Sequence, residues 1–329
     1  MTMDSREWLE ILRDEYVRDF IAGGGAAVKF AVGAEEVRAS LRDELRELAA
    51  SEECLFAQVD AATTKTHMVD HLFHDVARQI DWDELAYLFV SRVIVENGLR
   101  VPSTRADFNL AALASLNGQA ELLLRNDIKR WLTQSIFYDY KMSQEFRIAM
   151  IRLCMAQLDP EEKNSFLTNA VKEWLRGELR LVSAVKDALI FQKVARHNAR
   201  HMLFSLTHWL KLCAKRGLIL WLDVSRYTSG ARRTELGGLS YSTPAVMDGY
   251  EVLRQFIDGT DEMECCLVVV GTATEFFTDP RRGLDCYDAL RLRISDEVRD
   301  RTRQNPLSSL IRLSADVAAH PPVVSGGRP

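Results

Sequence analysis

Four short apolar segments constrain the fold of this chain more than any other feature of the sequence. They span residues 26–33, 54–60, 217–224 and 265–274, each of a length typical of a strand. Continuous apolar runs of this kind are typical of strands buried on both faces of a parallel sheet. A short link and an amphipathic helix join the first two segments, which is the order of elements in an α/β unit. The sequence therefore predicts an α/β fold.

A long stretch of helical periodicity separates the second apolar segment from the third. From about residue 66 to residue 215, one helical pattern follows another. Such a span is too long for a single crossover connection, so we expect it to pack as a lobe of its own. The predicted organisation is a first part of the α/β core (1–65), a helical insertion (66–215), a second part of the core (216–315) and a flexible tail (316–329).

Several helices have recognisable start signals. Serine and aspartate are favoured as N-caps, and proline is favoured at the first helical position. The predicted helices, with their caps where one is visible, are 5–20 (Ser5), 143–158 (Ser143), 160–176 (Asp159 before Pro160), 182–215 and 247–256.

The composition excludes a disordered chain, because 47% of the residues are hydrophobic and the net charge is only -5. No stretch approaches the length of an apolar membrane span, and the N-terminus lacks an apolar signal core. We therefore expect a cytoplasmic protein that does not contact membranes. The six cysteines show no metal-ligand spacing, and His67, His71 and His74 have no partner of that kind, so no metal is expected.

The charges are unevenly distributed along the chain. Residues 1–60 hold 14 acidic and 7 basic side chains, whereas residues 172–216 hold 10 basic and 3 acidic ones. A solvated helix face is the default interpretation of the basic stretch. The alternative is a surface that binds double-stranded DNA or an acidic partner. The candidate residues for that surface are Arg196, Arg200, Lys211, Lys215 and Arg216.

The first apolar segment leads into a helix, which is where a phosphate-binding loop would lie. The required pattern is Gly, four residues, then Gly-Lys-Ser/Thr, and here Gly33 and Ser40 stand at the right spacing. Arg38 and Ala39 replace the second glycine and the lysine. The loop needs that glycine to wrap phosphates closely and the lysine to neutralise them, so this change argues against nucleotide chemistry.

The third apolar segment carries a stronger signal. Four or more apolar residues close on Asp223, the Walker B pattern in which the aspartate holds Mg²⁺. The next residue is Val224, where a glutamate usually activates water. The fourth segment ends near Thr272 and Thr274, where such ATPases place a polar sensor of the γ-phosphate.

Three longer stretches make the sequence resemble a known family. The motifs GTxxFFxDxxRG and YxALRxRI within residues 250–294, together with residues 196–227 and 305–313, resemble the BREX-type ATP-binding proteins of bacterial phage-defence islands. The resemblance implies an ASCE-type P-loop NTPase fold, related to AAA+ proteins, and the helical pattern of residues 66–215 adds a large helical insertion to it. It also implies that Arg291 and Arg293 are candidates for arginines that face a nucleotide or a neighbouring subunit.

These features favour a degenerate, ATPase-like subunit of a DNA-modification or phage-defence complex, that is, a pseudo-ATPase. Its expected partners are the other subunits of that system, with double-stranded DNA as a further candidate and an oligomer as a possible state. No cofactor is expected, and ATP with Mg²⁺ would be the ligands of a residual site. Two alternatives stay open: an active NTPase in which Lys29 or Lys65 supplies the missing charge, and a DNA-binding adaptor without enzymatic activity.

Overall fold

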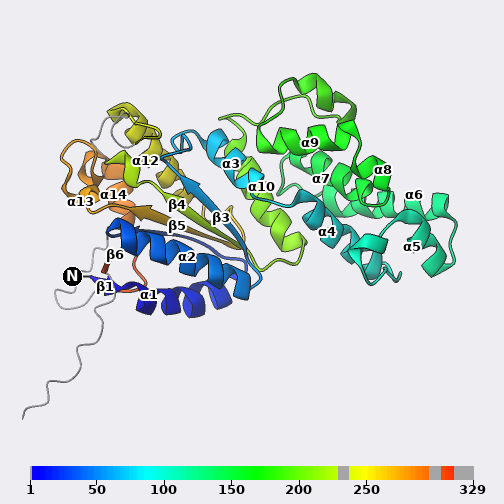
Figure 1. The fold of residues 1–329 in the computed structure, drawn as a ribbon, viewed down its shortest axis with the longest axis horizontal. Helices are drawn as coiled ribbons and strands as arrows, with labels where there is room; N and C mark the ends of the chain where they lie inside the picture. Colours follow the sequence, from blue (N-terminus) through cyan, green and yellow to red (C-terminus); the bar gives the residue numbers. More distant parts are fainter. Residues whose placement is uncertain (1, 229–236, 296–304, 315–329) are drawn as a thin grey trace, which may run out of the picture.

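The structure, a computed structural model, describes residues 2–228, 237–295 and 305–314. It is an elongated molecule in which a sheet flanked by helices lies at one end and a lobe built of helices extends from it (Figure 1). The predicted tail, 316–329, lies outside the described residues.

The described residues form one six-stranded sheet whose paired strands are all parallel. The four predicted strands are confirmed, and a two-residue strand at the N-terminus and a strand near residue 310 join them at one edge. The strand order is β1-β6-β2-β5-β4-β3. The strands are β1 (Met3–Asp4), β2 (Ala26–Val32), β3 (Leu55–Asp60), β4 (Leu218–Asp223), β5 (Cys266–Thr272) and β6 (Leu310–Ser314).

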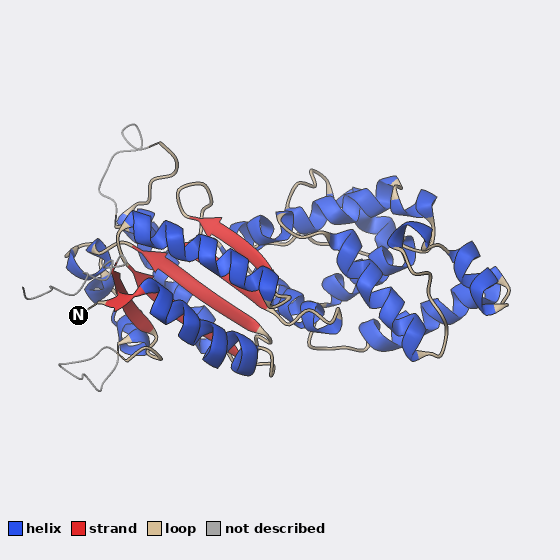
Figure 2. Cartoon of the chain, turned by 60° about the horizontal axis from the view of Figure 1, so that its bottom comes forward, coloured by secondary structure: helices blue, strands red, loops and turns tan. Residues whose placement is uncertain are grey.

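Helices cover both faces of the sheet, which explains why its central strands are buried throughout and apolar at nearly every position (Figure 2). Alternate residues of β2 enter different cores: Ala27 and Ala31 pack with the helices of one face, and Val28 and Phe30 pack on the other. The first face carries α1 (Ser5–Ile11), the π-helical stretch η1 (Leu12–Ile21) and α2 (Glu35–Ser51). The second carries α12 (Thr243–Asp258), α13 (Glu275–Thr278) and α14 (Asp288–Ile294).

The helical lobe is formed by the chain between β3 and β4 (Figure 1). Helices α3 and α10 lie at its junction with the sheet, and the others extend away from it. Its helices are α3 (Val69–Arg78), α4 (Trp82–Glu96), η2 (Arg105–Asp107), α5 (Leu110–Asn117), α6 (Glu121–Leu132), η3 (Thr133–Phe137), α7 (Gln144–Ala156), α8 (Pro160–Lys163), α9 (Phe166–Arg176), η4 (Val182–Ala188) and α10 (Ala199–Leu212).

Two of the predicted helix caps are confirmed, and one is wrong. The Ser143 hydroxyl accepts a hydrogen bond from the Phe146 amide at the start of α7. Asp159 caps α8, with proline at its first position. At the N-terminus, however, the cap is Asp4 rather than Ser5, because the Asp4 carboxylate accepts the first free amides of α1 while the short Ser5 side chain is buried.

Two predicted helices are broken in the structure. The helix expected over 160–176 is interrupted near Ser165, whose hydroxyl accepts from the Thr168 amide and starts α9 anew. The helix expected over 182–215 is the 3₁₀ helix η4 followed by an irregular segment and then α10. Leu189 ends η4 in the left-handed conformation, which an α-helix cannot continue through.

A cluster of ionisable side chains around the buried His208 joins the lobe to the core. His208 of α10 is 8% exposed and lies 2.6 Å from Asp139 through Nε2 and 2.5 Å from Glu264 through Nδ1. Glu264 precedes β5 and also accepts a hydrogen bond from Lys141 at 2.6 Å. Lys211 lies 3.6 Å from the same carboxylate. Side chains from three segments that are distant in sequence therefore meet around one imidazole.

The surroundings of Glu264 lead to a prediction about how the stability of the fold changes at acidic pH. Burial would raise the pKa of Glu264, but the hydrogen bonds from Lys141 and His208 and the charge of Lys211 outweigh it and hold that pKa at about 2. A carboxylate with a depressed pKa stabilises the fold above its ordinary value of 4.5, and this contribution is lost as the pH falls toward about 2. We therefore expect Glu264→Gln to be less stable than the wild type at neutral pH.

The same argument predicts that the two proteins converge in stability in acid. Urea unfolding midpoints measured from neutral pH downward should differ most above pH 4.5 and differ progressively less below it. A difference that stays constant across that range would show that Glu264 does not contribute through its charge.

Candidate functional site

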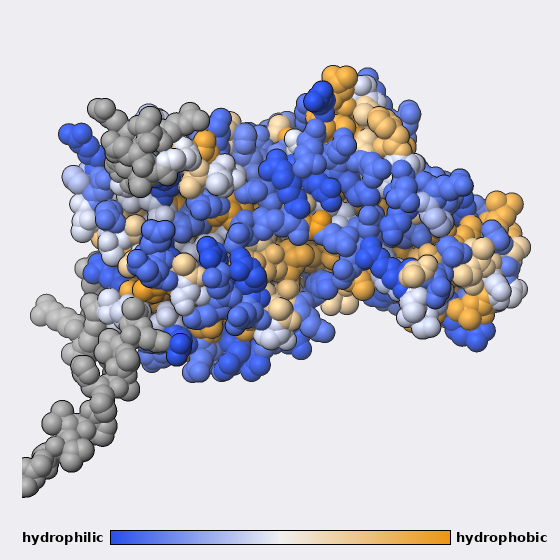
Figure 3. Space-filling view, in the orientation of Figure 1, coloured by the Kyte–Doolittle hydropathy of each residue, from blue (hydrophilic) through white to orange (hydrophobic). Residues whose placement is uncertain are grey.

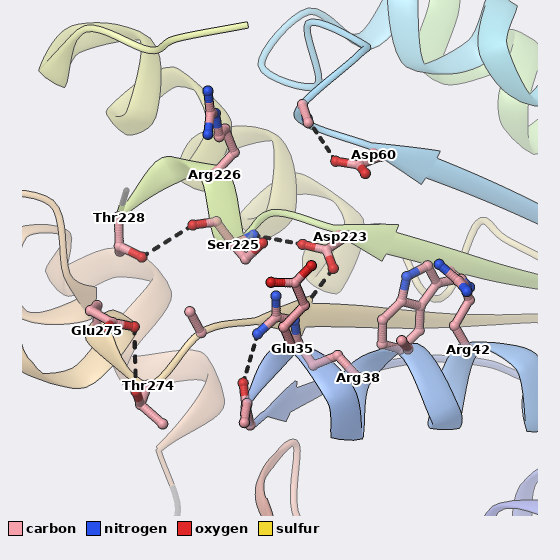
Figure 4. Close-up of a pocket in the computed structure, with 16 residues that line it drawn as sticks. Glu35, Arg38, Arg42, Asp60, Asp223, Ser225, Arg226, Thr228, Thr274 and Glu275 are labelled. Atoms are coloured by element: carbon pink, nitrogen blue, oxygen red, sulfur yellow. Dashed lines mark hydrogen bonds and ion pairs between the residues drawn. The ribbon is translucent and has the colours of Figure 1, made fainter. Parts of the chain in front are cut away.

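A cavity of about 860 Å³ lies at the carboxyl ends of β2, β3, β4 and β5 (Figure 4). The chain leaves β2 toward α2 on one face of the sheet and leaves β5 toward α13 and α14 on the other. Adjacent parallel strands whose connections diverge in this way open a crevice between them, and α/β proteins bind ligands there. The lining residues are Gly33, Ala34, Glu35, Arg38, Ala39, Arg42, Asp60, Ala62, Trp221, Asp223, Ser225, Arg226, Thr228, Ala273, Thr274 and Glu275.

The connection from β2 to α2 is only two residues long. Gly33 donates its amide to the Thr272 carbonyl at 3.1 Å, and α2 begins at Glu35 directly after Ala34. The segment aligned with a phosphate loop is therefore mostly helix. Ser40 lies on the exposed side of α2, where its hydroxyl donates to Glu44 at 2.9 Å, so the structure does not bring it into the cavity with Gly33.

Arg38 enters the cavity from the first turns of α2 and pairs with the predicted Walker B acid. Its Nε lies 3.4 Å from Oδ2 of Asp223, and its Nη1 donates to the Gly33 carbonyl at 2.7 Å. The two side chains are 9% and 19% exposed. The other carboxylate oxygen of Asp223 accepts the Ser225 amide at 2.9 Å. Both oxygens of Asp223 are thus engaged within the protein (Figure 4).

A second acid, Asp60, lies beside Asp223 at the floor of the cavity. The two residues are direct neighbours in the parallel pairing of β3 with β4. Burial raises the pKa of Asp60 and the Asp223 carboxylate adds to this effect, while the hydrogen bond from the Ala62 amide opposes it. Sequence reasoning did not select Asp60, although β3 visibly ends in an acid and the carboxyl ends of parallel strands meet at one edge.

The two predicted sensor threonines are in different environments. Thr274 lines the cavity, and its hydroxyl donates to Glu275 at 3.3 Å. Thr272 is 1% exposed within β5, and its hydroxyl oxygen has no hydrogen-bond partner among the described residues. Of this pair, only Thr274 could contact a ligand without rearrangement.

The two arginines of α14 lie outside the cavity lining. Arg291 pairs with Asp288 at 2.7 Å, and Arg293 pairs with Asp258 at the end of α12. The cavity instead receives Arg42 and Arg226, which the sequence did not single out. Arg226 donates from Nε to the Leu239 carbonyl at 2.8 Å, and could be recognised as a lining residue only from the fold.

Neither lysine considered as a substitute for the missing one lines the cavity. The Lys29 ammonium donates to the Leu307 carbonyl at 2.6 Å and lies 4.2 Å from the centre of the Tyr16 ring. Lys65 follows β3 and is likewise absent from the lining.

The predicted basic surface is largely engaged with acids of the same chain. Lys211 lies 3.6 Å from Glu264, Lys215 lies 3.7 Å from Glu84, and Arg216 lies 3.0 Å from Glu52. The two remaining candidates are held more loosely. Arg196 is 3.9 Å from Asp248, and Arg200 lies over the Phe204 ring.

The described residues contain no group of three or more histidine, cysteine or acidic side chains that could hold a metal ion. In the same part of the chain, no helix is both long enough and apolar enough to cross a membrane.

Comparison with known proteins identifies one family. Residues 124–318 match the family described as BREX system ATP-binding protein BrxC/D. This range covers more than half of the chain, including β4, β5 and α14, but it excludes β2 and α2. No curated protein and no solved structure matches the chain significantly. Because the match spans most of the lobe and the second part of the sheet, the chain belongs to the BREX system ATP-binding protein family and is a component of a phage-defence system.

Proposed function

We propose that this protein is a degenerate P-loop NTPase that serves its defence system as a structural or regulatory subunit without hydrolysing ATP. The observation that carries the proposal is the ion pair between Arg38 and Asp223. It satisfies the carboxylate that would otherwise hold Mg²⁺, and it comes from the sequence position where a phosphate loop would have its second glycine.

The sheet supports the P-loop part of this proposal. The strand expected before a phosphate loop, β2, lies next to the expected sensor strand β5, and β5 lies next to the strand that ends in Asp223. All three end at the same cavity. A nucleotide site on such a fold would lie at this edge, with phosphates near the start of α2.

The charges at the cavity support the loss of hydrolysis. Glu35 lies at the start of α2, and Figure 4 shows it beside Arg38 and Asp223, in the region where phosphates would have to lie. The acidic lining residues Glu35, Asp60, Asp223 and Glu275 outnumber the arginines Arg38, Arg42 and Arg226. Bringing a triphosphate into this site would require separating Arg38 from Asp223 without a lysine to compensate.

The helical lobe and its junction would then be the parts through which the subunit acts on its partners. Partner subunits fit the surface better than double-stranded DNA does, because Lys211, Lys215 and Arg216 are paired with carboxylates of the chain itself. Nucleic acid would have to compete with those pairs.

A steady-state ATPase assay tests the proposal. We expect the purified protein to release phosphate at the background rate with Mg²⁺ present, and Asp223→Ala to leave that rate unchanged. Thr274→Ala is the matched control for a change in the cavity lining that leaves the ion pair intact. Turnover that Asp223→Ala abolishes would identify the protein as an active ATPase and refute the proposal.

A further inference from the structure

A group of ionisable side chains outside the cavity lies where the helical lobe meets the sheet. At its centre is His208 of α10, with one ring nitrogen 2.6 Å from Asp139 and the other 2.5 Å from Glu264. Figure 3 shows hydrophobic surface between the lobe and the sheet, with hydrophilic side chains around it. The chain neighbours Trp209 and Met263 are buried in the apolar core that runs through both parts. Because His208 is 8% exposed, its ring nitrogens depend on protein partners rather than on water.

The geometry of the two contacts sets the charge of the ring. An ionised carboxylate only accepts hydrogen bonds, so each ring nitrogen of His208 must carry a proton to bond its partner. A neutral imidazole has one N–H group and one lone pair, and the lone pair would face a carboxylate oxygen. The two contacts therefore exist together only while the imidazole is a cation.

The proton on the imidazole is the one that changes across neutral pH. The charged groups that face the ring are Asp139 and Lys141 from the turn before α7, Lys211 from α10 and Glu264 from the segment before β5.

The neighbours of the imidazole keep their charge over this range. Burial would raise the pKa of Glu264, but the hydrogen bonds from Lys141 and His208 hold it at about 2. The hydrogen bond to Glu264 raises the pKa of Lys141 above its ordinary value of 10.5, and burial raises the pKa of the nearby Cys265 thiol above 9.0. Aspartate and lysine ordinarily titrate several pH units away from neutrality, whereas histidine changes charge between about pH 5 and 8.

The two carboxylates differ in what else satisfies them. Glu264 also accepts a hydrogen bond from the Lys141 ammonium at 2.6 Å and lies 3.6 Å from Lys211. Asp139 has no basic side chain other than His208 within ion-pair distance among the described residues. Its second oxygen accepts only the Lys141 amide, at 3.2 Å. A ring left with one proton therefore keeps it on Nε2, for Asp139.

The turn that carries Asp139 is also joined to α10 by a contact that does not depend on charge. The Ser143 amide at the end of this turn donates to the buried Ser205 hydroxyl at 2.9 Å. Glu264, by contrast, belongs to the sheet side of the junction, and the side chains that contact it all come from the lobe. Loss of the proton on Nδ1 therefore weakens the connection between the lobe and the sheet.

We propose that His208 is a pH-sensitive clasp between the helical lobe and the sheet. While the imidazole carries both protons, it bonds Asp139 of the lobe and Glu264 of the sheet together. When it loses one, the contact with Glu264 is given up, because a lone pair then faces an ionised carboxylate at 2.5 Å. Within this cluster, the lysines alone then hold Glu264. The inference concerns a site apart from the cavity and holds whether or not the cavity hydrolyses ATP.

Nitrogen NMR of the full-length protein labelled with ¹⁵N-histidine tests the protonation directly. We expect both ring nitrogens of His208 to be protonated at about pH 5.5 and only Nε2 at about pH 9. The signal of His208 is the one that His208→Gln removes. A ring that holds both protons at the higher pH, a ring with a single proton already at the lower pH, or a remaining proton on Nδ1 would each overturn the proposal.

Urea unfolding tests the contact with Glu264 without requiring His208→Gln to fold. Glu264→Gln should lower the folding equilibrium constant about tenfold more at about pH 6 than at about pH 9, the contribution of one hydrogen bond between charged groups. Asp139→Asn is the matched variant and should lower the constant by nearly the same factor at both values, because that hydrogen bond persists.

His201→Gln is the control for the loss of a histidine. His201 lies exposed on the same helix, so the variant should keep the pH dependence of the wild type. Two results contradict the clasp: an effect of Glu264→Gln that is equal at both pH values, and an effect of Asp139→Asn that disappears at the higher one.

Discussion

Replacing Arg38 with alanine is expected to lower the free energy of unfolding by about 3 kcal/mol, the typical cost of removing one partner of a buried ion pair. The guanidinium is 9% exposed and contacts both Asp223 and the Gly33 carbonyl. Its removal would leave Asp223 and the neighbouring Asp60 as two adjacent carboxylates in a largely buried site. The pKa of Asp60 is already raised by burial and by Asp223, so the loss of Arg38 would increase this repulsion.

Arg42→Ala is the control for this experiment. Arg42 comes from the same helix and lines the same cavity, but its side chain is 36% exposed and pairs with the exposed Asp43 at 3.0 Å. Exposed pairs of this kind contribute about 0–1 kcal/mol. Urea unfolding of the two variants, followed by tryptophan fluorescence, should separate them clearly. If Arg38→Ala were as stable as the wild type, the ion pair would not stabilise the fold. The idea that it takes the structural place of a lost nucleotide site would then be refuted.

The strands of the core could be predicted because burial on both faces is visible in the sequence. β2 and β5 are apolar at nearly every position, and each ends near a polar or glycine residue. The strands β1 and β6 carry no such signal. β1 is two residues long, and the alternating exposure of β6 reflects its place near the edge of the sheet. The positions of β1 and β6 depend on how the two ends of the chain pack against the sheet. A local sequence pattern carries no information about such distant contacts.

The candidate site was predictable in part. Asp223 and Gly33 were selected from strand ends and both line the cavity, because the carboxyl ends of parallel strands converge. The spacing from Gly33 to Ser40 was misleading, since it matches a loop pattern but the residues after Ala34 are helical and Ser40 faces solvent. The partner of Arg38 could not be found from the sequence, because Asp223 lies 185 positions away.

His208→Ala is the second change from which we expect a large effect, a loss of about 3–5 kcal/mol in the free energy of unfolding. Both ring nitrogens of His208 lie against carboxylates, so the ring donates to Asp139 and Glu264 together when it carries both protons. Alanine would remove both hydrogen bonds, leave a cavity where the buried His208 ring lies, and weaken a connection between the helical lobe and the sheet.

The control lies on the same helix. His201 is exposed, and His201→Ala should change the free energy of unfolding by less than about 0.5 kcal/mol, as surface substitutions generally do.

Hydrogen exchange would show which parts of the chain His208→Ala destabilises. Protection of the amides should fall first in α10 and in the segment around Asp139, whereas β2 and β5 should lose protection only with global unfolding. A uniform loss of protection would indicate that lobe and sheet unfold as one unit. Unchanged stability would show that Glu264 is satisfied by Lys141 and Lys211, and Asp139 by the Lys141 amide, without the imidazole.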